Sequence, residues 1–208
     1  MIIKSTTFIK SSTKLKDCPP FNKPEYAFIG RSNVGKSSLV NMLTGNGKLA
    51  KVSGRPGKTQ TINHFLINEN WYLVDLPGYG WARISDSQRK EWKVMIDNYL
   101  YNRENLMVIF VLIDSRIPPQ KIDVEFVNHL GENGIPFVLV FTKADKQSRV
   151  KTDQAVANFK NALKETFEEM PDIFITSSES DLGKEDILSY IERVNNLFVI
   201  PPDKQIIE

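Results

Sequence analysis

The pattern G-x-x-x-x-G-K-S stands at Gly30-Arg31-Ser32-Asn33-Val34-Gly35-Lys36-Ser37. This spacing is typical of a phosphate-binding loop, in which glycines let backbone N–H groups turn towards phosphate oxygens. The lysine of such a loop reaches the β- and γ-phosphates, and the final hydroxyl is a ligand for Mg²⁺. The apolar run from Tyr26 to Ile29 predicts a strand before the loop, and Ser38 to Leu43 predict a helix after it. This order would place the positive end of a helix against the phosphates.

Length and composition are those of one globular α/β domain. The chain has 208 residues, of which 41% are hydrophobic and 25% charged. It contains no apolar run near the ~20 residues that cross a bilayer, and its first residues lack the apolar core of a secretory signal. The single cysteine, Cys18, excludes an internal disulfide and a cysteine-cluster metal site. We therefore expect a cytoplasmic monomer with no membrane partner.

Charge is divided unevenly along the chain. Residues 1–60 contain eleven lysines and arginines against two acids, whereas residues 61–208 contain sixteen against twenty-three. Such polarity is typical of a protein with one face that favours polyanions. A solvated, lysine-rich N-terminal arm explains the same pattern equally well.

Alternating apolar and amphipathic segments predict a doubly wound α/β sheet that begins with a hairpin. Residues 45–61 are rich in Gly, Lys, Ser and Pro and predict a long loop. Strands are expected at about 6–10, 62–67, 71–76, 108–113, 137–141 and 173–175, and further helices at about 85–101, 120–132, 152–167 and 184–198.

Two further motifs follow predicted strands, at the edge of the sheet where ligands bind. The first is D-x-x-G at Asp75-Leu76-Pro77-Gly78, whose aspartate can hold Mg²⁺ through a water and whose glycine N–H can meet the γ-phosphate. The second is Thr142-Lys143-Ala144-Asp145. A carboxylate there accepts hydrogen bonds from N1–H and the 2-amino group of guanine, which adenine cannot offer, so Asp145 would select GTP over ATP.

A weaker signal is the turn Thr176-Ser177-Ser178 after the last predicted strand, where backbone N–H groups could contact guanine O6. Together with the phosphate loop, the order of these segments specifies the translation-factor-like GTPase class. The aliphatic stem of Lys143 is expected to cover the base.

Nearly the whole chain resembles one family. The segments GRSNVGKS, PGKTQTIN, DLPGYG and TKAD are similar to those of the EngB GTPases, bacterial members of the TrmE–Era–EngA branch. The resemblance implies a Ras-like P-loop GTPase domain with a six-stranded mixed sheet between helices, here with an added N-terminal edge strand. It implies an N-terminal extension at 1–24, a GTPase domain at 25–200 and a C-terminal tail at 201–208. It also implies a role in assembly of the large ribosomal subunit, linked to cell division and septation.

The resemblance assigns roles to individual residues. Ser37, Thr59 and Asp75 would hold Mg²⁺, with Thr61 as the alternative to Thr59. Lys36, Thr59 and Gly78 would carry the catalytic contacts. The segment Gly57-Lys58-Thr59-Gln60-Thr61 matches the switch I loop, and Ile175-Thr176-Ser177 would close the base pocket. Thr142 departs from the commoner asparagine and offers fewer hydrogen bonds, which favours modest nucleotide affinity.

Hydrolysis is expected to be slow without help. Ras-like enzymes orient the attacking water with a glutamine directly after D-x-x-G, and this chain has Tyr79, whose phenol is a poor base. A partner could supply the missing groups. Alternatively, the resemblance implies that Asn33 coordinates a K⁺ ion that stimulates hydrolysis. A hydrogen bond that stabilises the loop would explain the presence of this asparagine equally well. Gln60 and His64 are nearby polar candidates for positioning the attacking water. Neither is assigned a catalytic role, and we expect His64 to be structural.

Basic and aromatic residues around the predicted switches suit RNA. The aromatic residues are Trp81 and Trp92, and we expect Trp92 to pack in the core. The basic residues are Lys48, Lys51, Arg55, Lys58, Arg83, Arg89, Lys90, Lys93, Lys146, Arg149 and Lys151. The primary hypothesis is a GTP-controlled switch that binds ribosomal RNA or protein of the large subunit. The alternative is a regulatory switch that binds a division or cytoskeletal protein and no RNA.

Overall fold

The computed structural model describes residues 1–47, 49, 61–79 and 85–200. The strands are β1 (Thr6–Ser12), β2 (Glu25–Gly30), β3 (Ile62–Ile67), β4 (Trp71–Asp75), β5 (Leu106–Asp114), β6 (Phe137–Thr142) and β7 (Ile173–Ile175). The helices are α1 (Lys36–Thr44), α2 (Asp86–Asn102), α3 (Lys121–Glu132), α4 (Arg149–Leu163) and α5 (Lys184–Asn195), with short 3-10 turns at Leu15–Asp17 and Ala144–Lys146.

One sheet of seven strands, in the order β1-β3-β4-β2-β5-β6-β7, forms the centre of the fold. The β1–β3 and β3–β4 pairs are antiparallel, and all other neighbours are parallel. The expected hairpin is therefore β3–β4, and β1 is the added edge strand. The prediction of a mixed α/β sheet with an extra N-terminal strand is confirmed.

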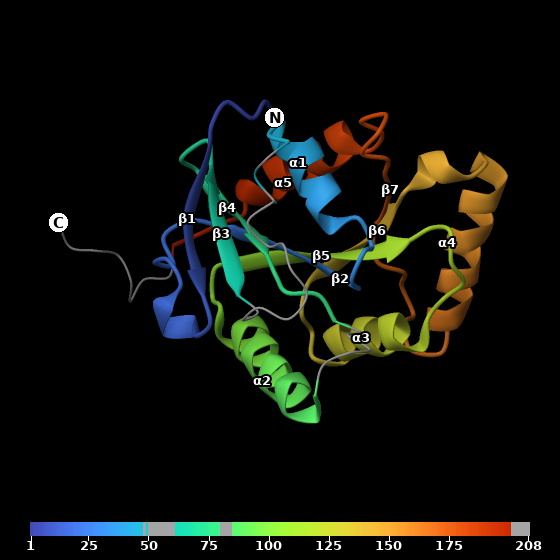
Figure 1. Cartoon of the computed structure of the whole chain (residues 1–208), viewed down its shortest axis with the longest axis horizontal. Coiled ribbons are helices and arrows are strands. Elements are labelled where there is room, and N and C mark those ends of the chain that lie inside the picture. The colour runs from blue at the N-terminus through green and yellow to red at the C-terminus, as the bar shows by residue number, and fades with distance from the viewer. Residues whose placement is uncertain (48, 50–60, 80–84, 201–208) are drawn as a thin grey trace.

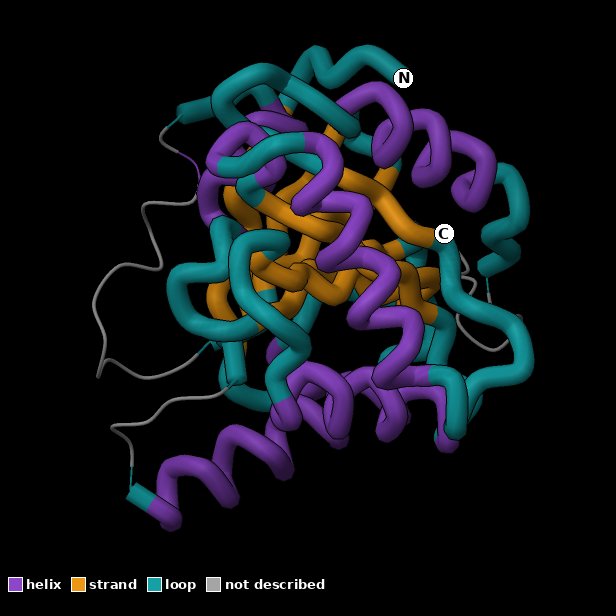
Figure 2. The backbone as a smooth tube through the Cα atoms, turned by 90° about the vertical axis from the view of Figure 1, so that its right-hand side faces the viewer, coloured by secondary structure: helices purple, strands orange, loops and turns teal. Residues whose placement is uncertain are grey.

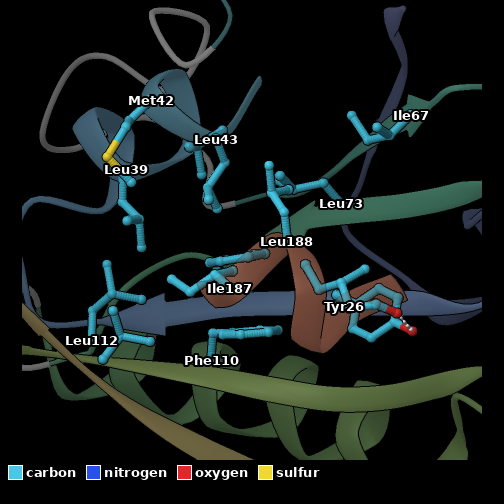
Figure 3. Close-up of a cluster of buried hydrophobic side chains, with 14 of the residues drawn as sticks. Tyr26, Leu39, Met42, Leu43, Ile67, Leu73, Phe110, Leu112, Ile187 and Leu188 are labelled. Carbon is cyan, nitrogen blue, oxygen red and sulfur yellow. Dashed lines mark hydrogen bonds between the residues drawn. The ribbon is translucent and has the colours of Figure 1, made fainter. Parts of the chain in front are cut away.

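Helices cover both faces of the sheet (Figure 1). Apolar residues of α1 and α5 pack on one face, whereas those of α2, α3 and α4 pack on the other. In Figure 3, Leu39 and Leu43 of α1 and Ile187 of α5 point towards the strand residues Phe110 and Leu112. The strands lie enclosed between these helix layers (Figure 2). The parallel strands are consequently buried on both faces, as their unbroken apolar runs predict.

A buried ionic cluster lies at the start of β2, at the opposite end of that strand from the phosphate loop. The guanidinium of Arg103 donates hydrogen bonds to both carboxylate oxygens of Glu25 and, 2.7 Å away, to the carbonyl of Pro19. The Tyr99 hydroxyl donates to the same carboxylate at 2.8 Å. Burial acts to raise the pKa of Glu25, but the hydrogen bonds from Arg103 and the neighbouring His64 lower it to about 2. The cluster joins the N-terminal segment to the sheet and to α2.

Element boundaries differ from the sequence expectations by a few residues. The largest shift is in α4, which spans Arg149–Leu163 rather than about 152–167. It begins earlier because the Ser148 side chain accepts a hydrogen bond from the Lys151 N–H and caps the helix, and it ends four residues earlier than expected. Helix α5 ends at Asn195 instead of Phe198, and β1 extends two residues beyond Lys10. Helix α2 agrees closely, because Ser85 and Gln88 form a capping box at its start.

Candidate functional site

The phosphate loop joins β2 to α1 through a left-handed glycine. Gly35 is the N-cap of α1 with φ of 107°, and no side chain caps the first turn of this helix. Gly30 is closely confined, because a Cβ there would lie 2.9 Å from the Leu112 carbonyl oxygen. Val34 is buried, whereas Ser32, Asn33 and Ser37 are exposed. The loop thus presents uncapped N–H groups and a serine hydroxyl at a helix N-terminus, a suitable site for phosphate.

Lys36 and Asp75 form an ion pair across the two phosphate-side motifs. Asp75 ends β4 and is 3% exposed, and Lys36 begins α1. Burial lowers the pKa of Lys36, to about 7, and the adjacent carboxylate opposes that effect by favouring the cation. The pair places the two residues expected to meet phosphate and Mg²⁺ next to each other, and in this structure each neutralises the other.

The D-x-x-G loop runs directly beside the phosphate loop. The Leu76 N–H donates to the Phe28 carbonyl at 3.0 Å, and the Tyr79 N–H donates to the Gly30 carbonyl at 3.3 Å. A Cβ on Gly78 would collide with that same Gly30 carbonyl, so only glycine fits at this position. Pro77 is half-buried, and its carbonyl accepts a hydrogen bond of 3.1 Å from the Trp92 indole. Trp92 also packs against the core, as predicted.

Thr142 makes a contact that the sequence did not reveal. Its hydroxyl lies 2.6 Å from the Val34 carbonyl and 3.2 Å from the Ile113 carbonyl, and its side chain is buried. An asparagine would be larger and would bring two donor hydrogens to satisfy in this space, against one for the threonine hydroxyl. The threonine therefore ties the predicted base-reading segment to the phosphate loop.

Asp145 is exposed at the end of this segment, where a base could reach it. The ammonium of Lys146 lies 2.9 Å from one carboxylate oxygen, and the Ser177 hydroxyl donates to the other at 2.8 Å. These hydrogen bonds, that of Lys146 first, lower the pKa of Asp145, so the carboxylate is ionised at neutral pH. It is thus held by neighbours on both sides and remains a hydrogen-bond acceptor.

The Ile175-Thr176-Ser177 loop lies next to Ala144, whose N–H donates to the Thr176 carbonyl at 3.1 Å. The Thr176 N–H donates to the Phe141 carbonyl at 2.7 Å, and the Ser177 N–H donates to Leu182 at 3.2 Å. Of the three N–H groups in the Thr176-Ser177-Ser178 turn that were expected to contact guanine O6, those of Thr176 and Ser177 are therefore bonded within the protein in this structure. The visible contribution of the loop is the Ser177 hydroxyl bond that orients Asp145.

A second carboxylate near the base-reading segment was absent from the sequence prediction. Asp114, the last residue of β5, accepts hydrogen bonds from Arg116 and, at 2.8 Å, from the Lys143 ammonium, which also donates to the Asn33 carbonyl. Burial acts to raise the pKa of Asp114, but these bonds lower it well below its usual range. Its position in the sequence could have identified Asp114 as a site residue, because it ends a buried parallel strand at the edge of the sheet where ligands bind.

Several expected site residues lie outside the described residues: Gly57, Lys58, Thr59 and Gln60 of switch I, and Trp81 of switch II. Thr61, the alternative metal ligand, is described, and its hydroxyl donates to Asn63 at 3.0 Å. His64 is fully buried in β3 and lies 3.4 Å from Glu25. It is a structural residue, as expected.

The donor set fits a Mg²⁺–nucleotide. Uncapped N–H groups and the Lys36 cation suit phosphate oxygens, and the hydroxyl of Ser37 with the carboxylate of Asp75 suits a hard cation that keeps several of its waters. No group of three or more His, Cys, Asp or Glu able to hold a metal occurs among the described residues. The combination of phosphate loop, D-x-x-G loop and carboxylate-bearing base segment on a mixed sheet defines a P-loop GTPase.

Comparisons with known proteins specify the family. Residues 25–143 match the family described as "50S ribosome-binding GTPase". The "Probable GTP-binding protein EngB" of Christiangramia forsetii is 57% identical over 196 residues, which cover 94% of this chain and 99% of that protein. This chain belongs to the EngB family of GTP-binding proteins.

Solved structures agree with this assignment. A crystal structure titled "probable GTP-binding protein engB" superposes with a TM-score of 0.64 and 26% identity, covering 84% of this chain and all of that one. The structure of Era with MgGDPNP and nucleotides 1506-1542 of 16S ribosomal RNA has a TM-score of 0.58 at 23% identity, covering 82% of this chain and 56% of that one, and shows a shared fold. Over the residues described, no helix is long and apolar enough to cross a membrane.

Proposed function

We propose that this chain hydrolyses GTP to GDP and phosphate in a Mg²⁺-dependent reaction and acts as a switch in assembly of the large ribosomal subunit, with a link to cell division and septation. The observation that carries the proposal is the convergence of three motifs. Lys36 meets Asp75, Thr142 is bonded to Val34, and Asp145 is held ionised at the same edge of the sheet. The description of the matched family as ribosome-binding supports the cellular role.

Recognition of guanine would rest on Asp145. Its carboxylate would accept hydrogen bonds from the N1–H and 2-amino groups of the base, while the stem of Lys143 covers the ring and Ala144, Ile175, Thr176 and Ser177 complete the pocket. Ser177 and Lys146 hold the carboxylate in place before the base arrives. Preorganisation of this kind lowers the entropic cost of binding.

Binding of the phosphates would engage the loop from Gly30 to Ser37 and the switch segments. Lys36 would exchange its Asp75 partner for phosphate oxygens, and Asp75 would then be available, with Ser37 and Thr59 or Thr61, to hold Mg²⁺. Bound Mg²⁺ neutralises charge on the β- and γ-phosphates. The Gly78 N–H would donate a hydrogen bond to the γ-phosphate, which GTP has and GDP lacks. Catalysis would therefore depend on Lys36, Gly78 and the switch I threonine.

Hydrolysis by the chain alone would be slow, because no glutamine follows D-x-x-G. Tyr79 is 3% exposed and its ring stacks on Phe126 at 4.7 Å between centroids. Burial, followed by the charge of Asp123, raises the pKa of Tyr79 well above its usual value, so its phenol is no base. Stimulation would come from a partner or from K⁺ held at Asn33. Equal turnover in K⁺ and Na⁺ buffers would exclude the K⁺ route.

Several of the bases expected to bind RNA are paired with acids in the described part of the chain, whereas Lys48, Lys51, Arg55, Lys58 and Arg83 lie outside the described residues. Arg89 pairs with Asp86, Lys93 with Asp97, and Arg149 with Asp153. Lys90 and Lys151 have no ion-pair partner within the described part of the chain. The free cations nevertheless lie on α2 and α4, the helices that follow switch II and the base-reading segment. We expect ribosome binding to weaken as the salt concentration rises.

The test is co-sedimentation with purified small and large ribosomal subunits across a salt series. The protein is loaded with GDP or a non-hydrolysable GTP analogue, and Lys90→Glu serves as the RNA-contact variant. Selective binding to the large subunit in the GTP form, weakened by Lys90→Glu, supports the proposal. Binding that is independent of the nucleotide, or absent at moderate salt, contradicts it.

A groove of about 1000 Å³ favours the alternative of a switch that binds a division or cytoskeletal protein. It lies between residues 13–21 and α2, with Leu15, Phe21 and Met95 among its lining. An apolar lining suits a protein segment better than a nucleic acid. Val94→Asp would place a charge in this lining. Lys90 lines the same groove, so the comparison uses Lys151→Glu on α4. Loss of ribosome binding in Val94→Asp, with no effect of Lys151→Glu, would indicate a protein contact.

A further inference from the structure

Residues from two distant segments form a partly buried ion pair beside the phosphate loop. Nε of Arg31, the second residue of the loop, lies 3.1 and 3.0 Å from the two carboxylate oxygens of Asp123 on α3. Asp123 is 1% exposed. The Arg31 side chain is therefore directed at α3, and the loop presents its backbone and Lys36 to phosphate without it.

Tyr79 packs next to this ion pair. Its ring stacks on Phe126, which lies one helical turn beyond Asp123 in α3. It belongs to the apolar cluster on the α2–α3–α4 face of the sheet, whereas Val34 of the phosphate loop belongs to the cluster on the opposite face. The hydroxyl of Tyr79 is buried next to Asp123, the acid of this ion pair. The residue at the position of the catalytic glutamine is thus part of the α3 interface.

Backbone contacts connect this interface to the site. Arg31 and Tyr79 form an isolated parallel bridge, and the Tyr79 N–H donates to Gly30. Gly78 passes so close to the Gly30 carbonyl that no side chain fits. A shift of Tyr79 away from α3 would therefore move Gly78, whose N–H is the proposed sensor of the third phosphate.

We propose that Arg31 and Asp123 are positioning residues whose ion pair holds Tyr79 against α3 and so places the Gly78 N–H to distinguish GTP from GDP. The inference rests on the proposed GTP switch. GDP lacks the third phosphate, so its binding uses the loop backbone, Lys36 and the base segment and does not depend on where Gly78 lies. The ion pair thus acts on the preference between nucleotides rather than on nucleotide binding in general.

The test is Asp123→Asn, which keeps the side-chain shape and removes the charge. Affinities for GDP and for a non-hydrolysable GTP analogue are measured by titration with Mg²⁺. We expect the affinity for the GTP analogue to fall about tenfold, within the usual range of coupling between sites, and the GDP affinity to change less than twofold. The matched control is Glu125→Gln on the same helix, whose exposed carboxylate pairs with Lys121 and should alter neither affinity.

The outcomes separate the inference from the proposed function. Equal losses for both nucleotides, or no loss, overturn the inference, whereas a wild-type chain that binds no guanine nucleotide overturns the proposed function. Arg31→Gln provides a second route should Asp123→Asn fail to fold, since the amide removes the positive charge of the pair. The double variant should lose no more preference than either single one, because both break the same pair. Additive losses would contradict the coupling.

Discussion

The two halves of the site are prepared for their ligand in different ways. On the base side, Asp145 is held by Ser177 and Lys146, and Thr142 is bonded to the phosphate loop, so the acceptor is in place without rearrangement. On the phosphate side, Lys36 and Asp75 neutralise each other, so a nucleotide must separate them. The base side would therefore determine which nucleotide binds, and the phosphate side would determine how tightly it binds and what the chain does afterwards.

The largest effect should come from the phosphate side. Lys36→Ala removes the cation and leaves the Asp75 carboxylate buried and unpaired. We expect the affinity for GDP to fall by about 4 kcal/mol, on the order of a thousandfold. Titration with a fluorescent GDP derivative would measure this. Lys160→Ala, an exposed lysine of α4, is the matched control, and an equal loss there would remove the special role of Lys36.

The Glu25 cluster lies at the far end of β2 from both halves of the site and should affect stability alone. The native pKa of Glu25, about 2, is below its usual value of 4.5, so its stabilisation is complete above about pH 4.5 and is lost as the pH falls towards 2. The shift corresponds to about 3 kcal/mol.

Urea unfolding at several pH values should therefore show Glu25→Gln with a flatter decline of stability between pH 5 and pH 2 than the wild type. Its GDP affinity at neutral pH should be that of the wild type. Glu132→Gln, an exposed glutamate of α3, should keep the wild-type pH dependence. A wild-type slope in Glu25→Gln would show that the carboxylate titrates normally.

Asp145→Asn should weaken recognition of the guanine base. The amide replaces two charge-assisted hydrogen bonds with weaker ones and presents a donor towards the donors of guanine. We expect GDP affinity to fall roughly 10- to 100-fold. Asp153→Asn, on exposed α4, is the control for the loss of one negative charge. Unchanged GDP binding in Asp145→Asn would mean that guanine is read elsewhere.

Thr142→Val tests the connection between the two halves. The change keeps the side-chain shape but leaves the Val34 carbonyl without its hydroxyl donor. We expect a loss of about 1 kcal/mol in the free energy of unfolding, together with a several-fold loss of GDP affinity. Thr44→Val removes a comparable bond to Val40 at the end of α1 and should cost stability only. If both variants behave alike, the Thr142 bond has no role in the site.

The sequence predicted the frame of the site better than its internal contacts. The segments around the C-terminal ends of β2, β4 and β6, which carry Lys36, Asp75 and Asp145, could be located because apolar runs and glycine spacing are local features. The edge strand and the start of α2 near Ser85 could be predicted for the same reason. The Arg31–Asp123 pair joins residues 92 positions apart, and the Thr142–Val34 bond joins residues 108 apart. Such pairs depend on how the sheet assembles, and no local pattern marks them.

The most direct measurement is a side-by-side titration of the wild type, Lys36→Ala and Asp145→Asn with GDP and ADP. We expect the wild type to bind GDP far more tightly than ADP. Lys36→Ala should weaken GDP binding strongly, whereas Asp145→Asn should reduce the preference for GDP over ADP. Equal affinity of the wild type for the two nucleotides, or an unchanged preference in Asp145→Asn, would contradict the division of the site into a base side that selects and a phosphate side that binds.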